Sequence, residues 1–140
     1  IEQELASLNN YLGLLKLQGK APNEIHINFE QQSQLVELPT MTLIFMVSHI
    51  LKNALQPSHA LSLTGKVTNH QYQIVLLHTS VKKRKLDMAY LRNIQRRLVF
   101  IFKHDAQLVS IKDKTSHKLI LTVPIKTQAT IHPDNLPSVI

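Results

Sequence analysis

The chain has 140 residues, of which 44% are hydrophobic, and contains no cysteine. This length favours one domain with a core of its own. The lack of cysteine excludes a disulfide scaffold and a cysteine-ligated metal site. No apolar run approaches the roughly 20 residues that a membrane-spanning helix needs. The formal net charge is +7, and most of it lies between residues 82 and 97, so the basicity forms a local patch.

Apolar residues at helical spacing predict an amphipathic helix over residues 2–18. The segment 24–30 alternates apolar and polar residues, which predicts a half-buried strand. After a polar loop, a second helix is expected with Pro39 in its first turn, and Pro57 is expected to stop it. The chain begins at Ile1 rather than Met, so we expect it to be part of a longer protein.

Two further strands are predicted over residues 60–67 and 72–79, joined by a turn near Asn69. Asp87 has the side chain of a good N-cap for a third helix. The buried side of that helix is expected to span residues 88–102, because its apolar residues recur at helical spacing.

A final hairpin is predicted from residues 106–112 and 117–125, followed by a polar tail. This order of elements predicts an α/β two-layer sandwich, with three helices on one face of a mixed, mostly antiparallel sheet of about five strands. We expect residues 1–126 to form the domain and residues 127–140 to be a loosely ordered tail.

Glycine is scarce, and its distribution limits the possible chemistry. The chain has three glycines, and none lies between residues 66 and 140. A loop that cradles phosphate groups needs glycine for positive φ and for close approach of backbone N–H groups, so no such loop can lie in the second half. The eight histidines include no pair at i, i+4 spacing. Histidines that are scattered over the surface or satisfied by local hydrogen bonds are favoured, and a metal site assembled in three dimensions stays open. No local motif supports a Ser/His/Asp triad.

The basic stretch over residues 82–97 has three interpretations. It can be a solvated helix face beside a loop, a contact for an acidic protein surface or an anionic nucleotide, or a nucleic-acid surface. Arg92 and Arg96 fall on the outer side of the predicted third helix, and Arg97 falls near its edge. Tyr90 is the only aromatic residue among the cations, and no helix-turn-helix pattern is present, which disfavours nucleic acid.

Several segments together resemble a known family. "IEQELASLNNYLGLLKLQ" resembles the segment after the phosphoacceptor region of LytS-type sensor histidine kinases, and "LPTMTLIFMVSHILKNAL" resembles their proline-led helix with its Asn motif. The most specific part is "YLRNIQRRLVFIFKHDAQLVSI", and "KLILTVPI" resembles the closing strand. The residues in register are Leu91, Arg92, Asn93, Arg97, Leu98, Ala106, Leu108 and Ile111. The resemblance covers roughly residues 1–126 and implies the family's C-terminal GHKL (Bergerat-fold) ATPase domain, which is also a two-layer sandwich.

The family's glycine boxes surround its ATP, and the resemblance implies that all of them are lost here. At the first box, His78 stands where the family has the Asp that reads adenine, and Ser80 stands where it has glycine. At the second box, Met88 and Tyr90 replace glycines, and the side chain of Tyr90 would occupy room that a phosphate needs. The third box ends at His117, again without glycine.

The Asn motif can be aligned in two registers. In one, Asn53 would hold Mg²⁺ and Lys52 stands where the family has an acid; in the other, Ser48 and His49 stand at the acid–Asn pair. Neither register keeps the Glu that would act as a base, so no catalytic residue is assigned, and Asn53 is the one candidate metal ligand. The degenerate nucleotide-binding positions are His49, Lys52, Asn53, His78, Ser80, Met88, Tyr90 and His117. The lid is shortened to a basic segment that contains Lys82, Lys83, Arg84 and Lys85.

We therefore expect a degenerate ATPase domain of a sensor histidine kinase, a pseudokinase that needs no cofactor and signals through protein contacts. One alternative is an active kinase that binds ATP and Mg²⁺ through a remodelled site, with the basic lid in place of the lost backbone donors. A second alternative is a basic nucleic-acid-binding module, although no nucleic acid is expected as a partner.

Partners and location follow from the resemblance alone. It implies two-component signal transduction with a response regulator or a partner kinase, and a homodimer in the full-length protein. It also implies a membrane-anchored parent protein, with this domain on the cytoplasmic side of the inner membrane. The helix over residues 1–18 would link to a dimerisation region outside the chain, and any phosphoacceptor histidine would precede Ile1.

Overall fold

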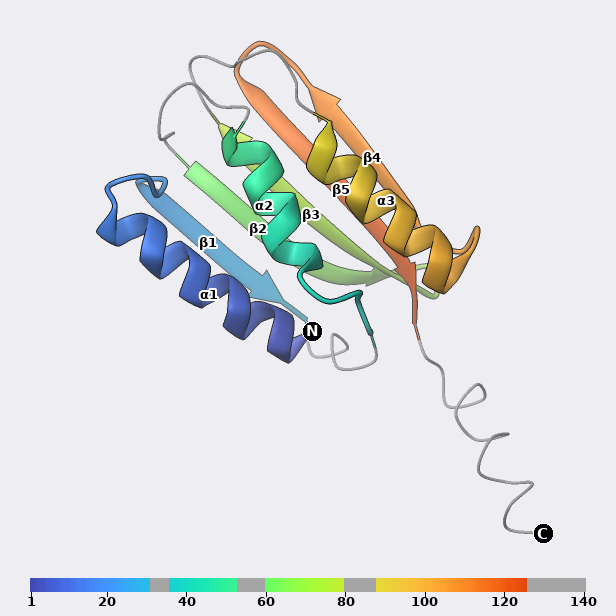
Figure 1. Ribbon diagram of the computed structural model, residues 1–140. Coiled ribbons are helices and arrows are strands. Elements are labelled where there is room, and N and C mark those ends of the chain that lie inside the picture. The colour runs from blue at the N-terminus through green and yellow to red at the C-terminus, as the bar shows by residue number, and fades with distance from the viewer. Residues whose placement is uncertain (31–35, 53–59, 80–87, 126–140) are drawn as a thin grey trace, which may run out of the picture.

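Three helices cover one face of a five-stranded sheet, so the chain folds as a two-layer sandwich (Figure 1). The computed structural model describes residues 1–30, 36–52, 60–79 and 88–125. The helices are α1 (Glu2–Leu17), α2 (Thr42–Lys52) and α3 (Ala89–Phe102). The strands are β1 (Glu24–Phe29), β2 (Ala60–Thr68), β3 (Gln71–Thr79), β4 (Gln107–Lys112) and β5 (Ser116–Pro124). The predicted fold class is confirmed, and the predicted tail over residues 127–140 lies outside the described residues.

The sheet is mixed, as predicted. Its strand order is β1-β2-β3-β5-β4, with β1 parallel to β2 and the other neighbouring pairs antiparallel. In the β2–β3 hairpin, Asn69 and His70 have φ of 48° and 66°, the combination that matches the twist of a two-residue turn. In the β4–β5 hairpin, Asp113 Oδ1 accepts hydrogen bonds from the backbone N–H groups of Thr115 (3.0 Å) and Ser116 (2.9 Å). Both predicted hairpins are confirmed.

The core lies between the sheet and the helices. Every second residue of β3 and of β5 is buried, and the residues between them are less buried. The helices all lie on one side of the sheet (Figure 1), so the buried residues point toward them. The helices contribute Leu8, Leu12, Leu43, Met46, Val47, Ile50, Leu91, Ile94 and Leu98 to the core. Each large apolar side chain that is buried in this way stabilises the fold by roughly 1.5–3 kcal/mol.

The start of α2 differs from the prediction. Pro39 does not lie in the first turn, because Met41 has a φ of 71° and the helix begins only at Thr42. The carbonyl of Pro39 instead accepts hydrogen bonds from the backbone N–H (3.2 Å) and the hydroxyl (2.6 Å) of Thr42. Glu4 of α1 also contributes: Oε2 accepts a hydrogen bond from Met41 N–H (2.9 Å), and Oε1 accepts one from Leu43 N–H (3.2 Å). A carboxylate from another helix thus satisfies donors at the start of α2.

The outer side of α3 lies as predicted. Arg92 and Arg96 are exposed, and Arg97 is half-buried at the edge of the helix. Met88 precedes the helix without a side-chain capping hydrogen bond. No described helix is long and apolar enough to cross a membrane.

Candidate functional site

Three histidines from three elements meet in the interior. His49 of α2, His78 of β3 and His117 of β5 are each 0% exposed. His78 and His117 are direct partners in the antiparallel pairing of β3 with β5. The rings of His49 and His117 meet edge to face, with their centroids 5.3 Å apart. These three residues are termed the histidine cluster. The family resemblance predicts a degenerate nucleotide-binding position at each of them, and the structure brings them together.

The histidine cluster is attached to the edge of the sheet. Ser110 of β4 forms a hydrogen bond of 2.8 Å with Nε2 of His117. This bond sets the orientation of the ring, and loss of such a partner by a buried polar atom typically costs about 1–3 kcal/mol. Within the described part of the chain, no group of three or more His, Asp or Glu side chains could hold a metal ion. The metal site that the sequence left open is therefore not found among these residues.

Tyr90 connects the start of α3 to α2. Its ring packs against the ring of Phe45, with centroids 5.9 Å apart. The Nζ atom of Lys52 lies 5.2 Å from the centroid of the Tyr90 ring, a cation–π contact worth about 0.5–1 kcal/mol at an exposed site. Met88 is half-buried and packs against the core. Side chains at the predicted second glycine box therefore occupy space beside α2.

None of the described candidate positions carries a carboxylate or amide side chain. Mg²⁺ prefers oxygen ligands, but the described candidate positions carry the side chains of His49, Lys52, His78, Met88, Tyr90 and His117. The imidazoles could accept a hydrogen bond from an amino group, yet they are 0% exposed. Close approach of phosphate to backbone N–H groups needs small residues, and Tyr90 is large.

Other predicted features lie outside the described residues. They are Asn53, Ser80, Lys82, Lys83, Arg84 and Lys85 of the predicted site and lid, together with the predicted helix stop Pro57 and the predicted N-cap Asp87.

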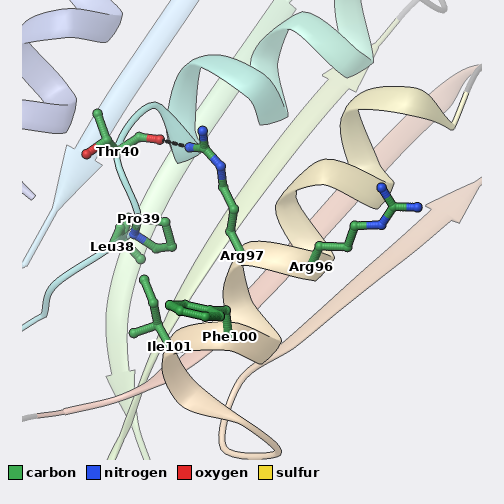
Figure 2. Close-up of a pocket in the computed structure, with 7 residues that line it drawn as sticks. All are labelled: Leu38, Pro39, Thr40, Arg96, Arg97, Phe100 and Ile101. Atoms are coloured by element: carbon green, nitrogen blue, oxygen red, sulfur yellow. Dashed lines mark hydrogen bonds between the residues drawn. The ribbon is translucent and has the colours of Figure 1, made fainter.

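A hollow at the C-terminal end of α3 has no counterpart among the predicted sites. It has a volume of about 530 Å³. Its lining comes from Leu38, Pro39 and Thr40 before α2 and from Arg96, Arg97, Phe100 and Ile101 of α3 (Figure 2). Arg97 donates a hydrogen bond to the carbonyl of Thr40, and its guanidinium lies 5.2 Å from the centroid of the Phe45 ring. These contacts hold the two walls of the hollow together, and we term it the arginine hollow.

A sequence signal for the arginine hollow does exist. Residues 98–102 are Leu-Val-Phe-Ile-Phe, a run that no single buried stripe of a helix can hide, because successive residues point in different directions. In the structure Val99 is 59% exposed and Phe100 is 88% exposed. The apolar residues of this run that do not fit on the buried side of α3 therefore mark this surface.

Comparison with known proteins gives structural matches. No protein-family model matches the chain, and no curated protein matches its sequence. The Erythrobacter litoralis EL346 blue-light activated histidine kinase matches at 15% identity and a TM-score of 0.59, over 89% of this chain and 42% of that one. The Acinetobacter baumannii histidine kinase AdeS matches at 10% identity and a TM-score of 0.57, over 90% of this chain and 63% of that one. The nucleotide-free catalytic domain of histidine kinase ThkA matches at 12% identity and a TM-score of 0.59, over 87% of this chain and 92% of that one.

These likenesses establish the fold. The chain has the fold of histidine kinase catalytic domains. It spans less than two thirds of the first two kinases, at 42% and 63% of their lengths, and nearly the whole ThkA catalytic domain, at 92%. At identities of 10–15%, the roles of residues in those kinases are not transferred to this chain.

Proposed function

We propose that the chain is a degenerate catalytic domain of a sensor histidine kinase, which does not bind ATP normally and signals through protein contacts. The histidine cluster is the observation that carries this proposal. His78 is fully buried and paired with His117, at the position where the resemblance to LytS-type kinases places the Asp that reads adenine. An imidazole in place of that carboxylate removes the group that would distinguish adenine from other bases.

The phosphate side of the proposed site supports the same proposal. The resemblance places glycines at the positions of Met88 and Tyr90, where they would let phosphate groups approach the backbone. Here Tyr90 contacts Phe45 and Lys52 of α2. A ligand phosphate would have to displace this ring and break both contacts.

The expected loss of affinity is large. Adenine recognition, Mg²⁺ ligation and backbone donation act together in such sites, and losing one buried partner costs about 1–3 kcal/mol. Losing all three weakens binding by several orders of magnitude, at tenfold for every ~1.4 kcal/mol. The domain would keep its fold and its surfaces, because the core residues do not depend on the nucleotide.

A titration with Mg-ATP tests the proposal directly. Isothermal titration calorimetry on the folded chain should detect no binding at about millimolar nucleotide, which corresponds to a binding free energy weaker than about −4 kcal/mol. Circular dichroism on the same sample controls for folding. A micromolar dissociation constant would defeat the proposal.

The two alternatives predict different outcomes. If ATP binds through the basic lid, replacing Lys82, Lys83, Arg84 and Lys85 by alanine abolishes binding while the far-UV spectrum stays unchanged. If the chain binds nucleic acid, the logarithm of its affinity for duplex DNA falls steeply with the logarithm of salt concentration, and a slope near zero removes that alternative.

Under the proposed function, the partners are proteins. They are a response regulator or a second kinase subunit, and the full-length protein is a homodimer anchored to the inner membrane with this domain in the cytoplasm. The stimulus would reach the domain by contact between proteins, without transfer of a phosphoryl group by this chain.

A further inference from the structure

We propose that the arginine hollow is a binding site for a small aromatic carboxylate, whose carboxylate group is held by Arg97 and whose ring packs against Phe100. The hollow has a volume of about 530 Å³, within the range of roughly 300–1,000 Å³ that small-molecule sites occupy. It lies beside the last turns of α3, whereas Tyr90 belongs to the first turn. Binding at the hollow therefore does not depend on whether the chain binds ATP.

The apolar part of the hollow is arranged to receive a ring. Arg97, Phe100 and Ile101 are spaced i, i+3 and i+4 on α3, so they share one face of the helix. Figure 2 shows these side chains extending toward the segment 38–40. Phe100 is 88% exposed, Ile101 is 52% exposed, and Leu38 on the opposite wall is half-buried. A ring that enters between Phe100 and Leu38 would remove apolar surface from water on both sides, and it would gain further by stacking on the Phe100 ring.

The charged part of the hollow is Arg97, which is half-buried. Its guanidinium is held by the hydrogen bond that it donates to the carbonyl of Thr40 and by its contact with the ring of Phe45, whose centroid is 5.2 Å away. In Figure 2 the side chain of Arg96 extends away from these residues, so the charge that faces the hollow is that of Arg97.

A carboxylate is the group that suits Arg97. A guanidinium carries five N–H donors, and among the described residues no carboxylate forms an ion pair with Arg97. The planar fork of arginine matches the two oxygens of a carboxylate. Because the contacts with Thr40 and Phe45 fix the guanidinium in advance, less side-chain freedom is lost when a ligand binds.

The size of the surface favours a small molecule over a protein. A stable protein interface takes roughly 20–30 residues from each partner, whereas seven residues line the hollow. Of these seven, Phe100 and Ile101 are the apolar residues that are more than half exposed. One ring with an attached carboxylate can contact both of them and Arg97, which are neighbours on one helix face.

Titration of the 140-residue chain with cinnamate, followed by backbone amide chemical shifts, tests the proposal. We expect saturable binding with a dissociation constant of about 1 mM or tighter, and the largest shifts at residues 38–40 and 96–101. Cinnamamide keeps the ring without the charge and should bind about tenfold more weakly. Acetate keeps the charge without the ring and should also bind more weakly. The affinity for cinnamate should fall as salt is added.

Two variants separate the contribution of the ring from that of the guanidinium. Phe100→Ala removes an exposed side chain, so the fold should survive, and cinnamate should bind about tenfold more weakly. Arg97→Lys keeps the positive charge but loses the planar fork, and it should also weaken binding. Arg92→Lys is the matched control, because Arg92 is exposed on the same helix and does not line the hollow; its affinity should equal that of the unmodified chain. Far-UV circular dichroism checks the fold of each variant.

Three results would overturn the proposal. The first is the absence of saturable shifts with cinnamate, and the second is equal affinity for cinnamate and cinnamamide. The third is unchanged cinnamate binding in both Phe100→Ala and Arg97→Lys. If a short peptide with glutamate beside phenylalanine binds at the hollow and cinnamate does not, the hollow is a protein-docking surface, which also contradicts the proposal. None of these measurements contains nucleotide, so their failure is distinct from a failure of the proposed function.

Discussion

The ring of Tyr90 and the ammonium group of Lys52 face each other across the two helices, with 5.2 Å between Nζ and the ring centroid. Tyr90 belongs to the first turn of α3, and Lys52 is the last residue of α2. The contact therefore joins the start of one helix to the end of the other. Under the proposed function, it occupies the place where the resemblance to LytS-type kinases puts the nucleotide.

Removing the Tyr90 ring should destabilise the fold. Tyr90→Ala deletes the aromatic contact with Phe45 and the cation–π contact with Lys52, which together contribute about 1–2 kcal/mol. Urea denaturation measures the change in the free energy of unfolding. Tyr90→Phe keeps the ring and is the matched control, expected within about 0.5 kcal/mol of the unmodified chain. Equal stability of Tyr90→Ala and the unmodified chain would show that the contact is not formed in solution.

The bond between Ser110 and His117 should stabilise the histidine cluster. Ser110→Ala removes the hydrogen bond of 2.8 Å to Nε2 of His117, and we expect a loss of about 1–2 kcal/mol in the free energy of unfolding. Ser7→Ala, at an exposed site on α1, should change stability by less than about 0.5 kcal/mol. The two variants are compared by thermal or urea unfolding, and similar values for both would contradict the prediction.

Glu4 should stabilise the start of α2, although it lies far from α2 in the sequence. Glu4→Ala leaves the N–H groups of Met41 and Leu43 without their carboxylate acceptor, and we expect a loss of about 1–2 kcal/mol by analogy with N-cap deletions. Glu2→Ala, on the exposed side of the same turn, is the control and should have little effect. Amide hydrogen exchange adds a local readout, because protection at the start of α2 should fall in Glu4→Ala alone.

The two glycines at Gly65 and Gly13 should respond to alanine in opposite directions. A Cβ atom at Gly65 would lie 2.5 Å from Phe29 Cδ2 and 2.6 Å from Cε1 and the hydroxyl of the buried Tyr72. This overlap should cost about 1–3 kcal/mol. A Cβ atom at Gly13 meets nothing within 4 Å, and Gly13→Ala within α1 should stabilise by about 0.5–1 kcal/mol. Chemical denaturation of both variants tests the prediction. A change of the same sign in the free energy of unfolding of both variants would refute it.

Elements with strong local periodicity could be predicted from the sequence. The burial of Leu91, Ile94 and Leu98 on α3 follows from helical spacing alone, and the turn at Asn69 follows from residue type. The N-terminal boundary of α2 could not be predicted, because the positive φ of Met41 depends on tertiary contacts. Methionine has no intrinsic preference for that conformation.

Prediction of the candidate site needed both the family resemblance and the three-dimensional packing. Nothing local in the sequence relates His49 to His117, which meet only because α2 packs over the β3–β5 pair. The resemblance to a family named both positions, and the packing of α2 over the sheet brings them together. The pairing of Arg97 with Thr40 was not predicted, since it joins residues that lie 57 positions apart in the sequence.

The hydrogen bonds between α1 and α2 have a mechanical consequence. Glu4 holds the backbone at the entrance to α2, and Tyr11 receives a hydrogen bond of 3.0 Å from Ser48, the residue before His49. Because these attachments are two turns apart along α1, the helix cannot slide or rotate without carrying its neighbour. A displacement of α1 would therefore be expected to displace α2 as well, and with it His49 of the histidine cluster.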